Sequence, residues 1–220
     1  MYDYLKDKSF LKRAQTDCSE MMKELEDELR EEGINSQFFL VGSGARNMVM
    51  RNGDGSIDFD YNLNILSCDD ILDCRNIKET VRKAFNRVLR NNGLHDVSDS
   101  KIPLTTDPFY YRDDEDIEFT IDVCIVRKCN GRWERLKHEK TGIFQEDKYY
   151  WNIAPNSNNY SEKAKIIKTI PGYWGKVREQ YKELKKMYLT RNDNDHPSFI
   201  CYIEAINNIY NHLKQKKLVK

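Results

Sequence analysis

The sequence lacks any apolar run long enough to cross a membrane. Its longest apolar stretches are strand-sized, and the one from Ile121 to Val126 is interrupted by Asp122. A helix that spans a bilayer needs roughly 20 predominantly apolar residues. The first residues alternate charged with apolar side chains and have no signal-peptide core. We therefore expect a cytoplasmic protein that does not enter a membrane.

Common cysteine and phosphate motifs are also missing. None of the six cysteines has a partner at C-x-x-C spacing, and no histidine pair lies nearby with zinc-finger spacing. Since zinc sites depend on such spacings, the cysteines are expected to be free thiols in a reducing compartment. The motif G-x-x-x-x-G-K followed by Ser or Thr is absent too, which excludes a P-loop nucleotide site.

The chain has no net charge, because 36 Lys and Arg residues balance 36 Asp and Glu residues. This balance disfavours a large, nonspecific nucleic-acid footprint. The charges are unevenly distributed, however. Residues 1–125 carry 16 basic and 26 acidic side chains, whereas residues 126–220 carry 20 basic and 10 acidic ones. An acidic half could hold cations and a basic half could hold phosphates, although two ordinary solvated surfaces would give the same counts.

The order of predicted elements indicates an α+β part followed by an all-α part. Apolar residues recur at three- and four-residue spacing between Ser9 and Glu32, which predicts a helix. Asn130-Gly131, between the predicted strand Ile117–Lys128 and Arg132–His138, predicts a hairpin turn. Strands are predicted at Gln37–Val41, Ile57–Leu66 and Ile117–Lys128, and helices at Ala45–Arg51, from Asp69 or Asp70 to Leu89, and at Tyr160–Ile170, Tyr173–Leu189 and Pro197–Lys217. We place the domain boundary between residues 1–150 and residues 151–220.

Three aspartates stand inside predicted strands. Residues two apart on a strand point the same way, so Asp58 and Asp60 should share one face. Asp122 is the single charge within an otherwise apolar strand. Buried carboxylates are costly unless something pairs with them, and carboxylate oxygens favour Mg²⁺ or Mn²⁺. A solvated strand edge would explain an Asp-x-Asp pair equally well, but it explains Asp122 less easily.

A short glycine-serine turn lies upstream of these aspartates. Gly42-Ser43-Gly44 follows an apolar strand and precedes the short predicted helix. Backbone N–H groups at such a turn and at a helix N-terminus can hold phosphate oxygens, and Gly42 permits a close approach. Taken alone, this tripeptide is more often a plain turn.

In this order, the three pieces resemble the polymerase-β-like nucleotidyltransferase superfamily. The family pattern is matched by Val41-Gly42-Ser43, by Ile57-Asp58-Phe59-Asp60-Tyr61 and by Thr120-Ile121-Asp122-Val123, within residues 36–126. The resemblance implies a palm-like mixed β-sheet flanked by helices over residues 1–150. The C-terminal helices over residues 151–220 are compatible with the helical region that many members append.

The resemblance also implies a site and a reaction. Two Mg²⁺ or Mn²⁺ ions would support displacement at the α-phosphorus of a nucleoside triphosphate with release of pyrophosphate. The expected catalytic and metal-binding residues are Asp58, Asp60 and Asp122. The expected nucleotide-binding residues are Gly42, Ser43, Gly44 and Arg46, together with Lys165 and Lys168 from the basic half, where a solvated helix face is the alternative.

The acceptor of the nucleotide is left open by the sequence. An RNA end such as that of tRNA, a second nucleotide, a small molecule and a protein side chain are all compatible with it. The rival interpretation is a non-catalytic nucleotide-binding or sensor module of the same fold. Such modules usually lack one of the carboxylates, and all three acidic positions are present in this chain.

Overall fold

The computed structural model describes residues 2–53, 55–111, 114–154, 160–190 and 198–219. The chain divides into two compact units. The larger unit is Leu5–Ala154. The smaller unit combines Met1–Tyr4 with Pro155–Lys220, so the first residues of the chain belong with its last helices.

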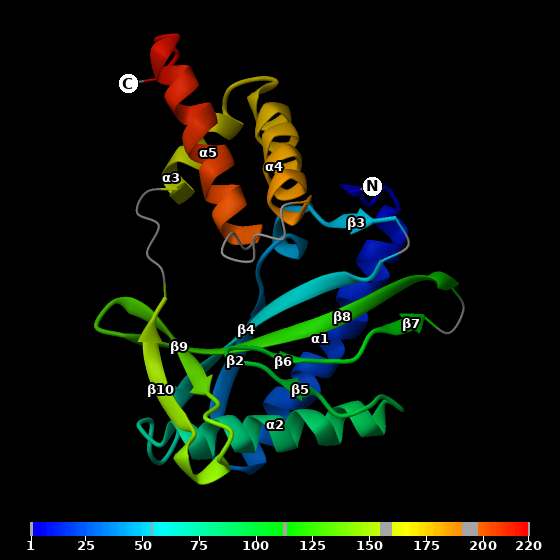
Figure 1. The fold of residues 1–220 in the computed structure, drawn as a ribbon, viewed down its shortest axis with the longest axis vertical. Helices are drawn as coiled ribbons and strands as arrows, with labels where there is room; N and C mark the ends of the chain where they lie inside the picture. Colours follow the sequence, from blue (N-terminus) through cyan, green and yellow to red (C-terminus); the bar gives the residue numbers. More distant parts are fainter. Residues whose placement is uncertain (1, 54, 112–113, 155–159, 191–197, 220) are drawn as a thin grey trace. The chain divides into compact units, whose positions relative to one another are not determined.

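A mixed sheet forms the centre of the larger unit (Figure 1). Its two long central strands, β4 (Ile57–Ser67) and β8 (Asp114–Cys129), run parallel, and the other pairings are antiparallel. The strand order is β10 (Lys148–Ile153), β9 (Arg132–Glu139), β8, β4 and β2 (Asn35–Leu40). Off this path, β6 (Leu104–Thr105) and β7 (Phe109–Tyr111) pair with β8, and β5 (Ser98–Asp99) pairs with β6.

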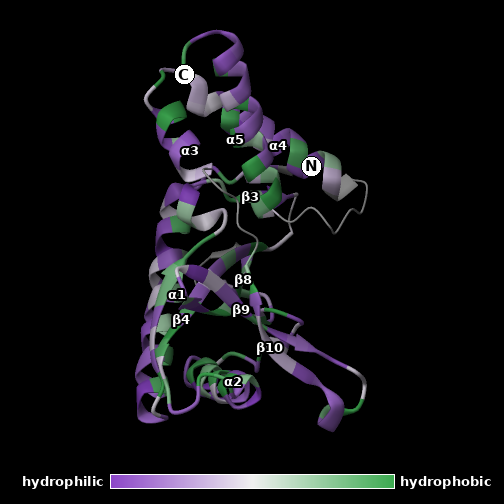
Figure 2. Cartoon of the chain, turned by 90° about the vertical axis from the view of Figure 1, so that its left-hand side faces the viewer, coloured by the Kyte–Doolittle hydropathy of each residue, from purple (hydrophilic) through white to green (hydrophobic). Residues whose placement is uncertain are grey.

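Helices α1 (Lys8–Glu31) and α2 (Cys74–Asn91) form the main core together with β4 and β8. Figure 2 shows both hydrophobic and hydrophilic residues on each of these helices, as expected of helices with one buried face. Phe119 lies at the centre of this core. Its ring contacts Phe10 at a centroid distance of 5.9 Å, Phe59 at 5.8 Å and Phe109 at 4.4 Å. Aromatic rings thus join α1 to three strands.

The β8–β9 hairpin turns as its sequence predicts. Asn130 and Gly131 both have positive φ, at 49° and 77°, which is the backbone of a tight two-residue hairpin. The start of α2 differs from the prediction, because its cap is Asp73 and not Asp69 or Asp70. The Asp73 carboxylate accepts from the Asn76 amide, whereas the Asp70 carboxylate accepts from the Leu72 amide and holds the turn before the helix.

The helix predicted at Ala45–Arg51 is wrong. The structure has one 3-10 turn, η1 (Gly44–Arg46), followed by the short strand β3 (Met50–Asn52). Asn47 adopts a left-handed backbone with φ 54°, which ends the turn at once. No helix of useful length therefore starts behind the Gly42-Ser43 turn.

The smaller unit is built from α3 (Tyr160–Lys168), α4 (Tyr173–Thr190) and α5 (Ser198–Gln215), close to the predicted helices. The segment predicted to separate the last two helices lies outside the described residues. The strand β1 (Tyr2–Tyr4) is attached to α4 through the Tyr4 hydroxyl, which donates to the Arg178 carbonyl at 2.6 Å. Among the helices that the structure describes, none is both long and apolar enough to cross a bilayer.

Truncation of Phe59 should destabilise the larger unit strongly. Its side chain is fully buried against Phe119, so Phe59→Ala should lower the free energy of unfolding by about 3–5 kcal/mol. Leu72→Ala is the control, because Leu72 is 70% exposed and its loss should cost little. Urea denaturation measures both values. Equal losses in the two variants would contradict this arrangement of the core.

Candidate active site

The three candidate aspartates lie on one face of the sheet, which we call the carboxylate face: the side of β4 and β8 that carries Asp58, Asp60, Thr120 and Asp122. In the parallel register Asp60 is paired with Asp122, and Asp58 with Thr120. Paired residues on neighbouring strands project to the same side. The alternate residues point the other way into the core, where Phe59 and the other apolar side chains between them are buried.

The environments of Asp58 and Asp122 differ. Asp58 is exposed, and its Oδ1 accepts from the Thr120 hydroxyl at 3.0 Å. Asp122 is half-buried, and its Oδ1 is inaccessible to water and has no hydrogen-bond partner. Burial raises the pKa of Asp122, the negative charge of Asp58 raises it further, and a hydrogen bond with Thr105 opposes the rise. Asp122 is therefore a carboxylate that lacks compensation for its charge.

The Gly42 turn packs directly against Asp60. Gly42 has φ 63°, and a Cβ atom at this position would overlap with the Asp60 Oδ2 atom. The Val41 amide donates to the Asp60 carbonyl at 2.8 Å, which fixes the turn to β4. Only glycine satisfies both the left-handed backbone and the missing space at this position. The turn predicted to hold phosphates is thus held next to a predicted metal ligand.

Arg46 and Gly44 contribute to the turn itself. The Arg46 guanidinium donates to the Gly42 carbonyl, and Gln15 of α1 donates to the Gly44 carbonyl at 3.3 Å. Ser43 is half-buried, and its carbonyl accepts from the Met48 amide at 2.9 Å. In this structure Arg46 braces the turn. Its contact with a nucleotide stays a prediction.

Lys165 and Lys168 lie on α3, in the smaller unit. Both are exposed, and the Lys168 Nζ atom lies 4.4 Å from the ring centroid of Trp174 at the start of α4. An exposed ammonium on an aromatic ring can exchange that contact for a phosphate at small cost. The predicted role of the two lysines in binding phosphate stays a prediction.

The residues of the carboxylate face have the chemistry of a site for hard divalent cations. All three candidates offer carboxylate oxygens, and the unpartnered Asp122 Oδ1 is an oxygen whose burial calls for a cation. Within the described residues, no three His, Cys, Asp or Glu side chains already converge on a common point that could hold a metal. The Asp58 and Asp122 carboxylates instead accept hydrogen bonds from the hydroxyls of Thr120 and Thr105. These partners are neutral, so a bound cation can replace them. The donor set fits Mg²⁺ or Mn²⁺, provided that the carboxylates rotate toward each other.

A second polar cluster lies at the other end of β9, where the sequence indicated no site residue. His138 is 3% exposed, and its two ring nitrogens lie 2.6 Å from an Asp99 oxygen and 2.9 Å from an Asp147 oxygen. The fully buried Lys78 of α2 pairs with the other Asp99 oxygen at 2.7 Å, and the Tyr149 ring stacks on His138 at 4.1 Å. These residues are far apart in the sequence, so no local motif could have indicated the cluster.

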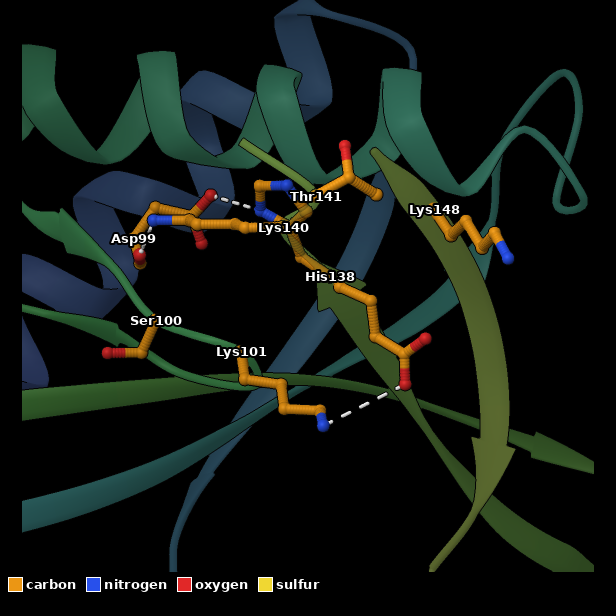
Figure 3. A pocket seen from close by; sticks show the side chains of 8 residues that line it. Asp99, Ser100, Lys101, His138, Lys140, Thr141 and Lys148 are labelled. Atoms are coloured by element: carbon orange, nitrogen blue, oxygen red, sulfur yellow. Dashed lines mark hydrogen bonds and ion pairs between the residues drawn. The ribbon is translucent and has the colours of Figure 1, made fainter. Parts of the chain in front are cut away.

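Asp99 and His138 of this cluster line an open pocket of about 480 Å³. Figure 3 shows the contact between Asp99 and His138, with Lys148 extending away from it. Because the buried charges already pair with one another, we assign the cluster a structural role in holding the loop between β9 and β10. The pocket is lined by Asp99, Ser100, Lys101, His138, Glu139, Lys140, Thr141 and Lys148.

No family model and no curated protein sequence matches the chain. Solved structures do match it. CdnC of E. coli MS115-1, solved with ATP, matches with a TM-score of 0.54 and 14% identity, covering 94% of this chain and 62% of that one. The CdnE cyclic dinucleotide synthase of Elizabethkingia meningoseptica, solved with GTP and Apcpp, matches with a TM-score of 0.52 and 16% identity, covering 90% and 69%.

The chain has the fold of the polymerase-β-like nucleotidyltransferases. CD-NTases, to which these similar structures belong, are members of that superfamily. The predicted fold class, a mixed sheet flanked by helices and followed by C-terminal helices, is thereby confirmed. The CD-NTase CdnG of Bradyrhizobium diazoefficiens, in complex with GTP, is covered to 41% at a TM-score of 0.47 and 15% identity, with 70% of this chain covered. The chain thus spans only part of the length of the structures that it matches.

Substitution of Gly42 should cost more than substitution of a glycine with the same backbone in open space. Gly53 has φ 54°, and nothing lies within 4 Å of the place that an alanine methyl group would take, so Gly53→Ala should cost only the backbone strain, about 1 kcal/mol. Gly42→Ala should cost about 1–3 kcal/mol more, because its methyl group collides with Asp60. Urea denaturation of both variants provides the comparison. Equal costs would show that the turn does not rest on Asp60.

Replacement of Asp122 by asparagine should stabilise the metal-free protein at neutral pH. The folded-state pKa of Asp122 is raised, so the protonated form is favoured on folding, and that advantage is lost as the pH rises through the folded-state value. Asp122→Asn should therefore raise the melting temperature at pH 7, and the gain should vanish below about pH 4, where the parent carboxyl is protonated. Asp69→Asn, at an exposed site, is the control. If Asp122→Asn lowered the melting temperature both at pH 7 and below pH 4, the inference that the charge of Asp122 is uncompensated would be refuted.

Proposed function

We propose that the protein transfers a nucleoside monophosphate from a nucleoside triphosphate to an acceptor and releases pyrophosphate. The observation that carries this proposal is the position of the Gly42 turn directly on Asp60, beside Asp58 and Asp122. The proposed phosphate-binding turn and the proposed cation ligands therefore lie on neighbouring positions of one sheet. The nucleotidyltransferase fold supports the proposal independently.

The chain's own residues have separate tasks in this reaction. Backbone amides of Ser43 and Gly44 would donate to the outer phosphates, and Arg46 would keep the turn in shape from behind. Asp58 and Asp60 would hold divalent cations, which supply Lewis-acid stabilisation of the charge on the phosphates when bound. Asp122 would complete the cation site and accept a proton from the acceptor hydroxyl, a task that its raised pKa favours.

We also propose which donor and which acceptor to test first. ATP and GTP are present in the similar structures, so these two triphosphates are the first donors to test. One of those structures is named as a cyclic dinucleotide synthase, which makes a second nucleotide the first acceptor to test. RNA, a small molecule and a protein remain further arms of the same experiment.

A non-catalytic nucleotide-binding module is the second candidate. It is favoured by one observation, that the described carboxylates do not already converge on a point that could hold a metal. Such a module would bind a triphosphate in the presence of Mg²⁺ without turnover. Calorimetry with Mn²⁺ and each triphosphate, run beside the activity assay, separates the two candidates.

Transfer activity should depend on each of the three aspartates. With triphosphates radiolabelled at the α-phosphate, Mg²⁺ or Mn²⁺, and either no acceptor, RNA or protein extract, the label should move to a product. Asp58→Asn, Asp60→Asn and Asp122→Asn should each lower that transfer by about a hundredfold or more, because each removes a ligand for the charge of the transition state. Asp69→Asn should retain full transfer. Label transfer that survives all three substitutions would refute the assignment.

A further inference from the structure

The carboxylate face continues beyond the aspartates as a row of polar side chains. Asn64 of β4 is paired with Val126 of β8, and Val126 is paired with Arg135 of β9. Since paired residues project to the same side, Asn64 and Arg135 lie on the carboxylate face. We call Asn64, Val126 and Arg135 the Asn64 row. The row is four residues from Asp60 along β4, a distance of roughly 13 Å. A nucleoside can span such a separation.

Two polar atoms of this row are buried without a hydrogen-bond partner. They are the Oδ1 atom of Asn64, a residue that is 8% exposed, and the Nε atom of Arg135. Within the described part of the chain, the Arg135 guanidinium also forms no ion pair with a carboxylate. Buried polar atoms are almost always satisfied in folded proteins, and each exception calls for an explanation such as a ligand. With Asp122 Oδ1, three of the six such atoms that the described residues contain lie on this one face.

Arg135 is half-buried on β9, where its register partner is Val126 of the central strand β8. A half-buried cation without a carboxylate partner is available there to a ligand.

Two aromatic rings lie across the same row. Phe39 of β2 is paired with Asn62, two residues before Asn64 on β4. Trp133 of β9 is paired with Lys128, two residues after Val126 on β8. The two aromatic residues therefore flank the Asn64 row from either side. Their rings meet edge to face at a centroid distance of 6.0 Å. The contact between them therefore crosses the Asn64 row, which accounts for the burial of Asn64 on an otherwise open face. Trp133 itself is 41% exposed.

The chemistry of this group selects a planar heterocycle. The Arg135 Nε–H is a donor that needs an acceptor, and the Asn64 Oδ1 is an acceptor that needs a donor. The edge of a nucleobase offers both side by side, whereas a phosphate or carboxylate offers acceptors only. Aromatic rings stack on any base and would replace the contact between Phe39 and Trp133.

The position of the row indicates which substrate it would receive. In phosphoryl transfer the attacking and leaving oxygens lie roughly in line with the phosphorus. The Gly42 turn, where the leaving pyrophosphate would be held, is on the β2 side of Asp60, whereas Arg135 is on the β9 side of Asp122. The attacking hydroxyl would thus approach from the side of Arg135.

We propose that Asn64 and Arg135, with Phe39 and Trp133 above them, form the binding site for the nucleobase of the acceptor. The inference rests on the proposed nucleotidyl transfer for the role of the bound nucleoside as acceptor, but the binding of a nucleobase does not depend on catalysis. It makes a nucleoside or nucleotide the acceptor and assigns base recognition to four side chains of the sheet.

Binding of nucleosides without phosphate to the full chain tests the site directly. Adenosine, guanosine, cytidine and uridine are titrated into metal-free protein, with tryptophan fluorescence as the signal and Trp133→Phe to assign that signal to Trp133. At least one nucleoside should quench it. Asn64→Leu and Arg135→Met should each raise the dissociation constant about tenfold or more, since each removes a hydrogen bond to the base.

A matched control is available in the same row. Gln37 of β2 is paired with Asn64 but is exposed, so Gln37→Leu should leave nucleoside affinity unchanged. Asn64→Leu should also fold with undiminished stability, because it removes a buried acceptor that has no partner. Loss of binding in a variant that melts at the parent temperature then reports on the site and not on folding.

The outcomes separate this inference from the proposed function. Nucleoside binding that the two substitutions weaken, in a protein without transfer activity, would support the base site and refute the transferase. Transfer with an unchanged KM for a nucleotide acceptor in Asn64→Leu and Arg135→Met would overturn the base site alone. Quenching by tripolyphosphate and by no nucleoside would show an anion site and overturn the inference. Absence of any nucleoside effect on Trp133 would overturn it as well.

Discussion

The parallel pairing of β4 with β8 is the constraint on which the rest of the larger unit depends. It aligns Asp60 with Asp122 on one side, and on the other side it aligns apolar residues that α1 and α2 bury. A shift of one residue would move the carboxylates into the core and the aromatic rings into water. Burial of each aromatic side chain on the core face of the sheet contributes about 1.5–3 kcal/mol. This burial maintains the register against the repulsion between carboxylates on the opposite face.

That register also explains why the Gly42 turn has so little freedom. The Val41 amide is bonded to the Asp60 carbonyl, and the Gly42 backbone rests on the Asp60 side chain. The turn is therefore positioned by the same residue that it is proposed to serve. Several features of the carboxylate face lower the stability of the fold. They are the left-handed backbone of Gly42, the buried Asp122 carboxylate and the unpartnered atoms of Asn64 and Arg135. Concentration of such costs at one place is typical of sites under functional constraint.

Strand alternation and helical periodicity were sufficient to predict the main elements and the shared face of Asp58 and Asp60. What could not be predicted depends on contacts between distant segments. Asp73 rather than Asp70 caps α2 because Asp70 is used in the preceding turn. The helix predicted at Ala45–Arg51 does not form because Asn47 adopts a left-handed backbone. Asparagine allows this backbone but does not require it, so the sequence alone could not predict it. The cluster around His138 joins residues of β5, β9, α2 and the loop before β10, which have no fixed spacing in the sequence.

The Asn64 row shows how pairing adds information that periodicity cannot supply. In the sequence, Asn62 and Asn64 are simply polar residues that follow an Asp-x-Asp pattern, and Arg135 belongs to a separate hairpin. Register alone places Asn64, Val126 and Arg135 in one line across three strands. The Asn64 Oδ1 and Arg135 Nε atoms are both buried, and neither has a hydrogen-bond partner. Their burial costs free energy that the fold does not recover, and a ligand with complementary edges would recover it on binding.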